Sequence, residues 1–224
     1  MAQRSAPAAA FFDVDETLVT QKTLFDFLRF HYESTGRPPT AHARARAALT
    51  RLREKGAPRE EANRAYYALY ADAVEQDLTV QGSAWFQEQL SVGGFFHPPG
   101  VAALRAHQKA GHATVLVSGS FFPCLLPIAQ HLGVEDVFGT APLVVDGRLT
   151  GEVVRPMIGA AKAEVALDWA AGYGVDPADC FAYGDHSSDL QLLSAVGHPV
   201  VVGDDPALRA HVARAGGRTL PGVP

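Results

Sequence analysis

The 224-residue sequence has little of several features that define large classes of protein. It contains only two cysteines, Cys124 and Cys180, each in an apolar stretch, so we expect a reduced, intracellular setting and no disulfide framework. No apolar run approaches the roughly 20 residues of a membrane-spanning helix, so we expect no integral membrane association. The first ten residues, MAQRSAPAAA, lack the apolar core of a signal peptide, and this favours a short disordered lead on a cytoplasmic protein.

Excess positive charge is also missing. The formal net charge is −5, and nucleic acid is therefore not expected as the main partner, because binding it requires a dominant basic surface. Hydrophobic residues make up 47% and charged residues 19%, which is ordinary for a globular protein. The sequence shows no internal repeat and no low-complexity tract. Its length suits one large domain, or one domain with an insertion.

Strand and helix signals alternate in two separated parts of the chain. A short apolar run over residues 8–14 predicts a buried strand, and alternation resumes from residue 98. Between them, residues 21–95 contain helical patterns only. This organisation predicts an α/β fold: a doubly wound parallel sheet in a Rossmann-like core of residues 1–20 and 96–224, with an inserted all-helical cap over residues 21–95.

The individual elements follow from periodicity and from turn residues. Gly133 is placed to end a helix, and Asp146-Gly147 predicts a hairpin turn within residues 140–154. In the insertion, helices are predicted over 23–32, 40–55, 59–76 and about 80–92. In the core, helices are predicted over 101–110, 121–132, 159–171 and 206–213, and strands over 112–117, 179–183 and 199–203.

Polar clusters follow three of the predicted strands. Asp13 and Asp15 follow the first, Ser118-Gly119 the second, and Asp185 with Asp189 a later one. Parallel strands bring their carboxyl ends to one edge of a sheet, which is where ligands bind in such folds, so the clusters are expected to share one cleft.

Several carboxylates in one cleft are unstable together without a cation. Oxygen ligands of this kind favour a hard ion, and Mg²⁺ is the usual choice beside a phosphate. Lys162 near a helix start, the Ser118 hydroxyl and the Gly119 amide are suited to hold phosphate oxygens. The combination predicts phosphoryl-transfer chemistry.

These motifs, in this order and strand context, resemble the haloacid dehalogenase-like (HAD) superfamily. The carriers of the resemblance are Asp13-x-Asp15-x-Thr17, the strand that ends in Ser118, Lys162, and Gly184-Asp185-x-x-x-Asp189. The helical insertion resembles the C1 cap of the phosphoserine-phosphatase-like branch. The resemblance covers nearly the whole chain.

The resemblance implies a two-step displacement. Asp13 would attack phosphorus to form an aspartyl-phosphate, and Asp15 would act as general acid and then as general base. Mg²⁺ would be held by the Asp13 and Asp185 carboxylates and the backbone carbonyl of Asp15, and Asp189 would orient that shell or ligate in part. Ser118, Gly119 and Lys162 would hold the transferring phosphoryl group, and Thr17 would steady the turn and the general acid.

The class of reaction has more than one interpretation. In this superfamily the dehalogenase branch lacks the second aspartate, so Asp15 favours a phosphatase acting on a small-molecule phosphomonoester. A phosphotransferase would use the same aspartyl-phosphate and differ in its acceptor. A non-catalytic phosphate-sensing or partner-binding module should have lost Asp13, Asp15 or Lys162, and all three are present.

The substrate is constrained by one departure from the family. Phosphoserine phosphatases carry a glutamate nine residues after the nucleophile, where it pairs with the substrate amine; here the position is Lys22. A cation there argues against phosphoserine and favours an anionic or hydroxyl-rich leaving group. His186 is expected to be a solvated loop residue or a substrate contact.

Two groups of side chains in the insertion have alternative interpretations. A basic series is expected to form a solvated helix face, with an anion funnel or a contact to an acidic partner as alternatives: Arg44, Arg46, Arg51, Arg53, Lys55, Arg59 and Arg64. An aromatic set is expected to form mainly the core of the insertion, with one or two members at the pocket: Phe25, Phe27, Tyr66, Tyr67, Tyr70, Trp85 and Phe86. Phe121 and Phe122 are further candidates for the substrate-side wall.

Overall fold

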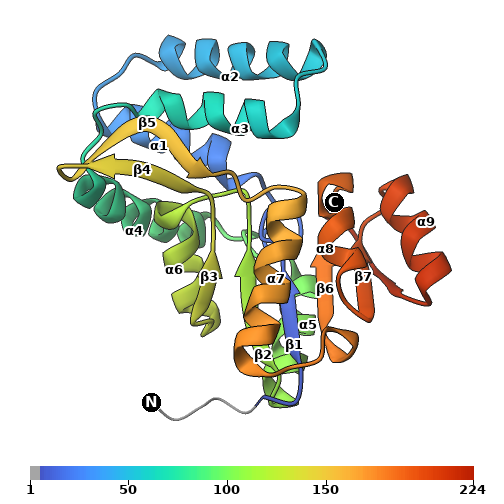
Figure 1. Cartoon of the computed structure of the whole chain (residues 1–224). Coiled ribbons are helices and arrows are strands. Elements are labelled where there is room, and N and C mark those ends of the chain that lie inside the picture. The colour runs from blue at the N-terminus through green and yellow to red at the C-terminus, as the bar shows by residue number, and fades with distance from the viewer. Residues whose placement is uncertain (1–5) are drawn as a thin grey trace.

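A computed structural model describes residues 6–224, so the first five residues of the predicted disordered lead lie outside the described residues. Six parallel strands form the central sheet, in the order β3-β2-β1-β6-β7-β8 (Figure 1). The strands are β1 (Ala9–Phe12), β2 (Ala113–Val117), β3 (Asp136–Phe138), β6 (Phe181–Gly184), β7 (His198–Val202) and β8 (Arg218–Leu220). This confirms the predicted doubly wound α/β fold.

Helices cover both faces of the sheet because its buried strands have apolar residues on both sides. Ala9 and Phe11 of β1 face a core shared with α7, α8 and α9, whereas Ala10 and Phe12 face a core shared with α5 and α6. On one face of the sheet lie α7 (Ala160–Tyr173), α8 (Leu190–Ser194) and α9 (Pro206–Ala215). On the other face lie α5 (Pro98–Lys109) and α6 (Phe122–Leu132). Gly133 ends α6 in the left-handed conformation, as predicted.

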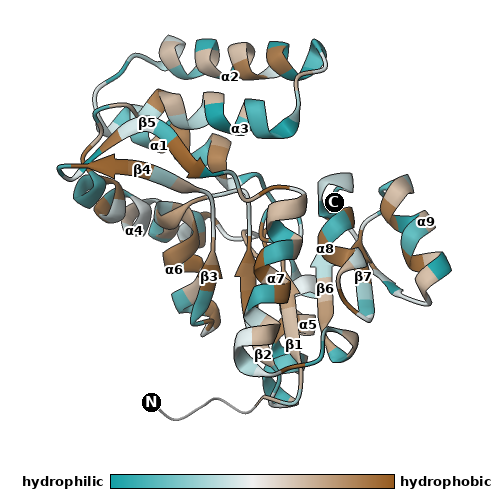
Figure 2. Ribbon diagram, viewed as in Figure 1, coloured by the Kyte–Doolittle hydropathy of each residue, from teal (hydrophilic) through white to brown (hydrophobic). Residues whose placement is uncertain are grey.

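Four α-helices lie between β1 and α5, the helix that leads back to the sheet. They are α1 (Thr23–Ser34), α2 (Pro39–Glu54), α3 (Arg59–Tyr67) and α4 (Glu75–Val92). In Figure 1, α2 and α3 lie farthest from the sheet, beyond the carboxyl ends of the strands, and in Figure 2 α2 alternates between hydrophilic and more apolar residues. The aromatic side chains predicted to form the core here are buried, apart from the half-buried Phe25.

The single helix predicted over 59–76 is wrong. The chain leaves α3 through a short 3₁₀ helix, η1 (Ala68–Tyr70), and Asp72 then takes a positive φ of 65° before α4 begins. The cause is a tertiary contact: the amide of Asp72 donates to the carbonyl of Leu149 at 2.8 Å, and the amide of Leu149 donates to Ala73 at 2.9 Å. These bonds dock the chain on a hairpin that is distant in sequence.

That hairpin consists of β4 (Ala141–Val145) and β5 (Arg148–Arg155), a separate two-stranded sheet. Asp146 and Gly147 form its turn with φ values of 50° and 73°, which confirms the predicted turn. Arg64 of α3 reaches the carbonyl of Val153 at 3.2 Å. The hairpin therefore packs on the inserted helices although it follows β3 in sequence.

Apart from short 3₁₀ helices, three elements of the described residues have no counterpart in the sequence prediction: the edge strands β3 and β8, and the five-residue helix α8. Within residues 6–224, no helix combines the length and the apolar composition needed to cross a bilayer.

Candidate active site

The sheet brings the predicted polar motifs to one edge. Strand β1 lies between β2 and β6, and Phe12 is in register with both Leu116 and Tyr183. Asp13, Ser118 and Asp185 follow the ends of these three strands directly. The amide of Asp13 donates to the carbonyl of Tyr183 at 3.0 Å, which extends the ladder by one bond. Residues far apart in sequence thereby share one site.

The chain turns sharply between the two aspartates of the first motif. Three amides, at positions 17, 18 and 19, donate to the carbonyl of Val14 at 2.9–3.3 Å, and Glu16 adopts a positive φ of 56°. The turn is supported from α5, where Gly100 lies so close that an added Cβ would be 2.0 Å from the Thr17 carbonyl oxygen. His97 Nδ1 lies 3.0 Å from the same oxygen. A fixed turn holds Asp15 beside Asp13.

Lys162 is the cation at the centre of the acidic group. Its Nζ lies 2.7 Å from Asp13 Oδ1 and 2.6 Å from Asp189 Oδ1, and its side chain is only 4% exposed. Burial lowers the pKa of Lys162, but the two carboxylates outweigh burial and raise it above its ordinary value. The ammonium is therefore charged at any physiological pH. A lysine on an exposed helix face would have no such environment.

Asp15 is held at the N-terminus of α1. Its Oδ1 accepts a hydrogen bond from the amide of Thr23 at 3.1 Å. Burial, and then the charge of Asp13, raise the pKa of Asp15 to about 7, against the smaller opposing effects of Thr23 and Lys162. A carboxyl group with this pKa can both give and accept a proton near neutral pH.

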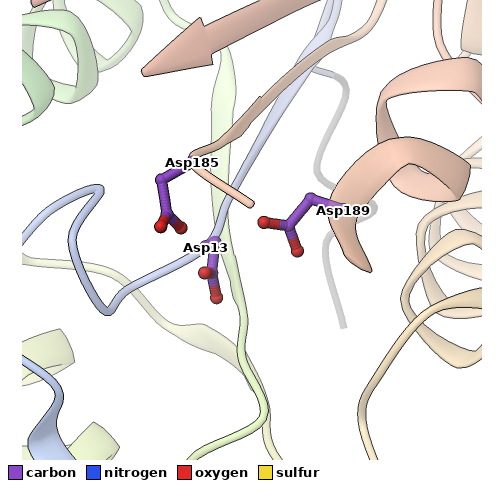
Figure 3. Close-up of side chains that lie close together, drawn as sticks. All are labelled: Asp13, Asp185 and Asp189. Carbon is purple, nitrogen blue, oxygen red and sulfur yellow. The ribbon is translucent and has the colours of Figure 1, made fainter. Parts of the chain in front are cut away.

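Asp185 and Asp189 complete the acidic group. Carboxylate oxygens of Asp13, Asp185 and Asp189 lie within 4.8 Å of one another, and Figure 3 shows the three side chains converging from separate segments. Burial and the charges of Asp13 and Asp189 raise the pKa of Asp185 to about 8. Gly184 makes the arrangement possible, because an added Cβ would be 2.6 Å from the Cβ of Asp189.

Asp189 and Thr17 are buried side chains next to Asp13 and Asp185. Asp189 is 1% exposed, and its second oxygen accepts a weak bond from the amide of His186 at 3.3 Å. Thr17 is fully buried, and its hydroxyl is 3.5 Å from Asp185 Oδ1. Neither side chain lines the pocket that opens above these carboxylates. Both side chains are therefore placed to orient the residues that they contact.

The loop after β2 is fixed through the carbonyl of Gly119. This oxygen accepts hydrogen bonds from Asn63 Nδ2 at 3.0 Å, the Tyr67 hydroxyl at 3.0 Å and the Thr140 hydroxyl at 2.9 Å. The Ser118 hydroxyl accepts from the amide of Ser120 at 3.2 Å. The sequence interpretation missed Asn63 and Thr140; the available signal was a buried asparagine on the apolar face that carries Tyr66, Tyr67 and Tyr70.

A pocket opens above the acidic group. Its lining combines most of the predicted site residues, but not Asp185, Asp189 or Thr17, with side chains of the inserted helices: Asp13, Asp15, Lys22, Leu24, Phe25, Leu49, Arg53, Arg59, Ala62, Asn63, Tyr66, Ser118, Gly119, Ser120, Ile158, Lys162 and Ser188. All the members of the basic series are exposed, and two of them, Arg53 and Arg59, line this pocket. Lys22 lines it as well and forms an ion pair with Glu16 at 2.9 Å.

Two expectations about the pocket wall change. Phe121 and Phe122 do not line it: Phe121 is fully buried against Tyr67 and Phe27, with ring centroids 5.0 and 5.7 Å away. It belongs to the aromatic core between α6 and the inserted helices. His186 is half-buried and does not line the pocket; its Nδ1 accepts a hydrogen bond from the amide of Ser188 at 3.1 Å, which caps a short helical turn.

The donor set fits a hard divalent cation. Among residues 6–224, the carboxylates of Asp13, Asp15, Asp185 and Asp189 are accompanied by one buried ammonium, and burial together with this excess of negative charge raises the pKa of Asp185. The donors are oxygens, the ligand type that Mg²⁺ prefers. The Asp15 side chain is not part of the three-carboxylate group, since it bonds to the start of α1.

Comparisons with known proteins agree with this fold. A family model described as haloacid dehalogenase-like hydrolase matches residues 10–194. The chain therefore belongs to the haloacid dehalogenase-like hydrolase family, as the motifs predicted.

Among its relatives is a probable phosphatase of Mycobacterium tuberculosis, to which it is 30% identical over 221 residues that cover 94% of this chain and 74% of the relative. A protein of unknown function from Bordetella pertussis Tohama I has a similar structure, with a TM-score of 0.84, 24% identity, and coverage of 96% and 98% of the two chains. A phospho-aspartyl intermediate analogue of phosphoserine phosphatase has a TM-score of 0.66 at 21% identity, with coverage of 94% and 92%. The two structures share the fold.

Proposed function

We propose that the protein is a Mg²⁺-dependent phosphomonoester hydrolase that works through an aspartyl-phosphate on Asp13. The supporting observation is the pairing of two aspartates in different environments at one pocket. Asp13 is ion-paired to a buried lysine, whereas the pKa of Asp15 is raised to about 7. A nucleophile must be ionised and a general acid must carry a proton, so the two environments match two roles. The relative named as a probable phosphatase supports the same class of reaction.

In the first step, a carboxylate oxygen of Asp13 attacks phosphorus, and the bond from phosphorus to the ester oxygen breaks. Asp15 gives its proton to the departing oxygen, so that a neutral alcohol leaves. In the second step, Asp15 accepts a proton from water as that water attacks phosphorus, and the bond between phosphorus and Asp13 breaks. Inorganic phosphate leaves, and both aspartates return to their starting states.

The remaining site residues position the phosphoryl group. Lys162 reduces repulsion between Asp13 and phosphate oxygens because it is charged and contacts Asp13 directly. The Ser118 hydroxyl and the loop amide of Gly119 are proposed donors to those oxygens. The carboxylates of Asp13 and Asp185 and the carbonyl of Asp15 are the proposed ligands of Mg²⁺, with Asp189 and Thr17 orienting them. When bound, the cation supplies positive charge to the phosphoryl oxygens.

Turnover of p-nitrophenyl phosphate tests the proposal. The protein should release p-nitrophenol and inorganic phosphate in equal amounts with Mg²⁺, and neither product in excess EDTA. An excess of p-nitrophenol over phosphate when glycerol is added would indicate transfer to an alcohol and favour a phosphotransferase. Absence of release under all conditions would contradict catalysis and favour a non-catalytic module.

The acidic group also predicts how pH changes metal-dependent stability. Asp185 has a pKa of about 8 in the folded protein against an ordinary 3.8, so between these values the folded state holds a proton that the unfolded state has lost. This contribution to stability is complete below about pH 4 and disappears as the pH rises through 8. Mg²⁺ competes with that proton, and should therefore raise the melting temperature more at pH 8 than at pH 6.

Thermal melts with Mg²⁺ or EDTA at the two pH values measure this effect. At a concentration 100 times the dissociation constant, a ligand stabilises by about 2.7 kcal/mol, or roughly 5–10 °C for a chain of this size. Asp185→Asn should abolish the Mg²⁺ shift and raise the melting temperature of the metal-free protein at pH 8. Asp179→Asn, which removes an exposed carboxylate outside the pocket, is the matched control. An equal Mg²⁺ shift in both variants would contradict the proposed ligands.

Two broader expectations accompany this function. We propose that residues 1–20 and 96–224 form the catalytic core and that residues 21–95 form the cap over its pocket, to which α2 and α3 contribute Leu49, Arg53, Arg59 and Asn63. We also propose a reduced, cytoplasmic setting, which is consistent with two free and buried cysteines, Cys124 and Cys180.

A further inference from the structure

The pocket wall opposite the acidic group carries uncompensated positive charge. Arg53 lies at the end of α2 and Arg59 at the start of α3, on either side of one short turn, and both line the pocket. Both side chains are exposed, and within residues 6–224 neither guanidinium has a carboxylate partner. Lys22 differs, since Glu16 neutralises it at 2.9 Å. The two arginines therefore have free donors at the pocket.

The segment that carries Arg59 lies near the start of α7, the helix that carries Lys162. An added Cβ at Gly159, three residues before Lys162, would lie 3.5 Å from Oε1 of Glu60, the neighbour of Arg59. The start of α3 thus lies beside the turn that leads into α7.

The rest of the wall offers little to a hydroxyl-rich molecule. The Tyr66 hydroxyl is occupied by the carbonyl of Leu24 and by the Tyr70 hydroxyl, each at 2.7 Å. The Asn63 amide nitrogen donates to Gly119, and its oxygen lies 3.4 Å from the Thr140 hydroxyl. The remaining lining from the inserted helices includes several apolar side chains, among them Leu24, Phe25 and Leu49.

The surface around the two pocket arginines is also positively charged. Residues 37–64 contain eight arginines and lysines against three glutamates, in a chain whose formal net charge is −5. All eight cationic side chains are exposed. A concentrated positive surface at the mouth of a pocket raises the local concentration of anions and their rate of entry.

From these observations we infer that the preferred substrate carries a second anionic group, separated from its phosphomonoester by an apolar carbon body, and that Arg53 and Arg59 bind that group. This inference rests on the proposed phosphatase function and names its substrate class. A carboxylate or a second phosphate has the required chemistry, because a guanidinium forms charge-assisted bonds with either. A substrate amine would find no free carboxylate at this end of the pocket, and a sugar would find few free polar partners.

The test compares 4-carboxyphenyl phosphate with 4-carbamoylphenyl phosphate, which have the same shape and differ in one charge. The quantity measured is the ratio of their kcat/KM values in the parent, in Arg53→Gln/Arg59→Gln and in Arg44→Gln/Arg51→Gln. The last variant removes the same charge from α2 residues outside the pocket. Because the same two esters are used throughout, differences between their leaving groups cancel when variants are compared.

The ratio should fall about tenfold or more in Arg53→Gln/Arg59→Gln, the loss expected for a charged hydrogen bond, and stay within about twofold in the control. An equal fall in both variants would overturn the inference, because a diffuse field rather than a binding subsite would then set the preference. An unchanged ratio in both would also overturn it. If the parent hydrolyses neither ester, the proposed function itself fails, and that outcome is distinct from turnover without preference.

Discussion

Asp13→Asn should lower kcat for p-nitrophenyl phosphate by at least about 10⁴-fold, because no other group replaces a lost nucleophile. The fold should survive, since Lys162 keeps its 2.6 Å ion pair with Asp189 when the Asp13 carboxylate is removed. The variant also removes one of the carboxylates that repel Asp185. The kinetic loss should therefore come with a thermal melt similar to that of the parent.

A chemical trap separates this loss from a general disturbance of the site. When the parent is mixed with a ³²P-labelled phosphomonoester and quenched in acid, label should remain on the protein and be released by hydroxylamine, as expected for an acyl phosphate. Asp13→Asn should retain no label, whereas Asp179→Asn, which changes an exposed carboxylate outside the pocket, should behave like the parent. Label that persists in Asp13→Asn would place the intermediate on another residue.

Asp15→Asn should slow the two steps unequally, depending on the leaving group. Loss of a general acid costs about 10²–10⁴-fold, and the cost is greatest for an alkyl phosphate because an alkoxide cannot leave without a proton. p-Nitrophenolate leaves readily, so Asp13 should still be phosphorylated by that ester. The second step still lacks its base, and we expect a burst of about one p-nitrophenol per protein followed by slow turnover.

Rapid-mixing kinetics on p-nitrophenyl phosphate and on an alkyl phosphate would measure both effects. Glu16→Gln is the matched control, since it removes the next carboxylate in the same turn and leaves the proton donor in place. It should give neither a burst nor a difference between the two esters. If Asp15→Asn slowed both esters equally and gave no burst, Asp15 would be a structural residue.

The sequence predicted the central sheet because its inner strands are short apolar runs followed by polar motifs, as in Phe11-Phe12-Asp13. The edge strands β3 and β8 were missed because three residues are too few to show a period, and Arg218–Leu220 is largely polar. The break after α3 was missed for another reason. It depends on bonds between Asp72 and Leu149, which are far apart in sequence, and local propensity carries no trace of such a contact.

The residues of the candidate site also divide into those that the sequence pattern locates and those that tertiary packing locates. Asp13, Asp15, Ser118, Lys162 and Asp185 follow strands or begin a helix, so topology alone brings them together. The roles of Asn63 and Thr140 depend on where α3 and the β4–β5 hairpin lie, and those positions are set by packing. Lys22 was recognised as a departure from the family, but its pairing with Glu16 could be seen only in the folded chain.

The three hydrogen bonds on the Gly119 carbonyl have a mechanical consequence. Two of the donors, Asn63 and Tyr67, belong to α3, and only Thr140 does not. Any movement that lifts α3 to admit a substrate must break both bonds, at roughly 1–3 kcal/mol in total. The Gly119 carbonyl would then be held by Thr140 alone, and it would regain its full set of bonds only when α3 returned. Entry to the pocket would thus loosen the phosphate-binding loop, so hydrolysis should be favoured in the shut molecule.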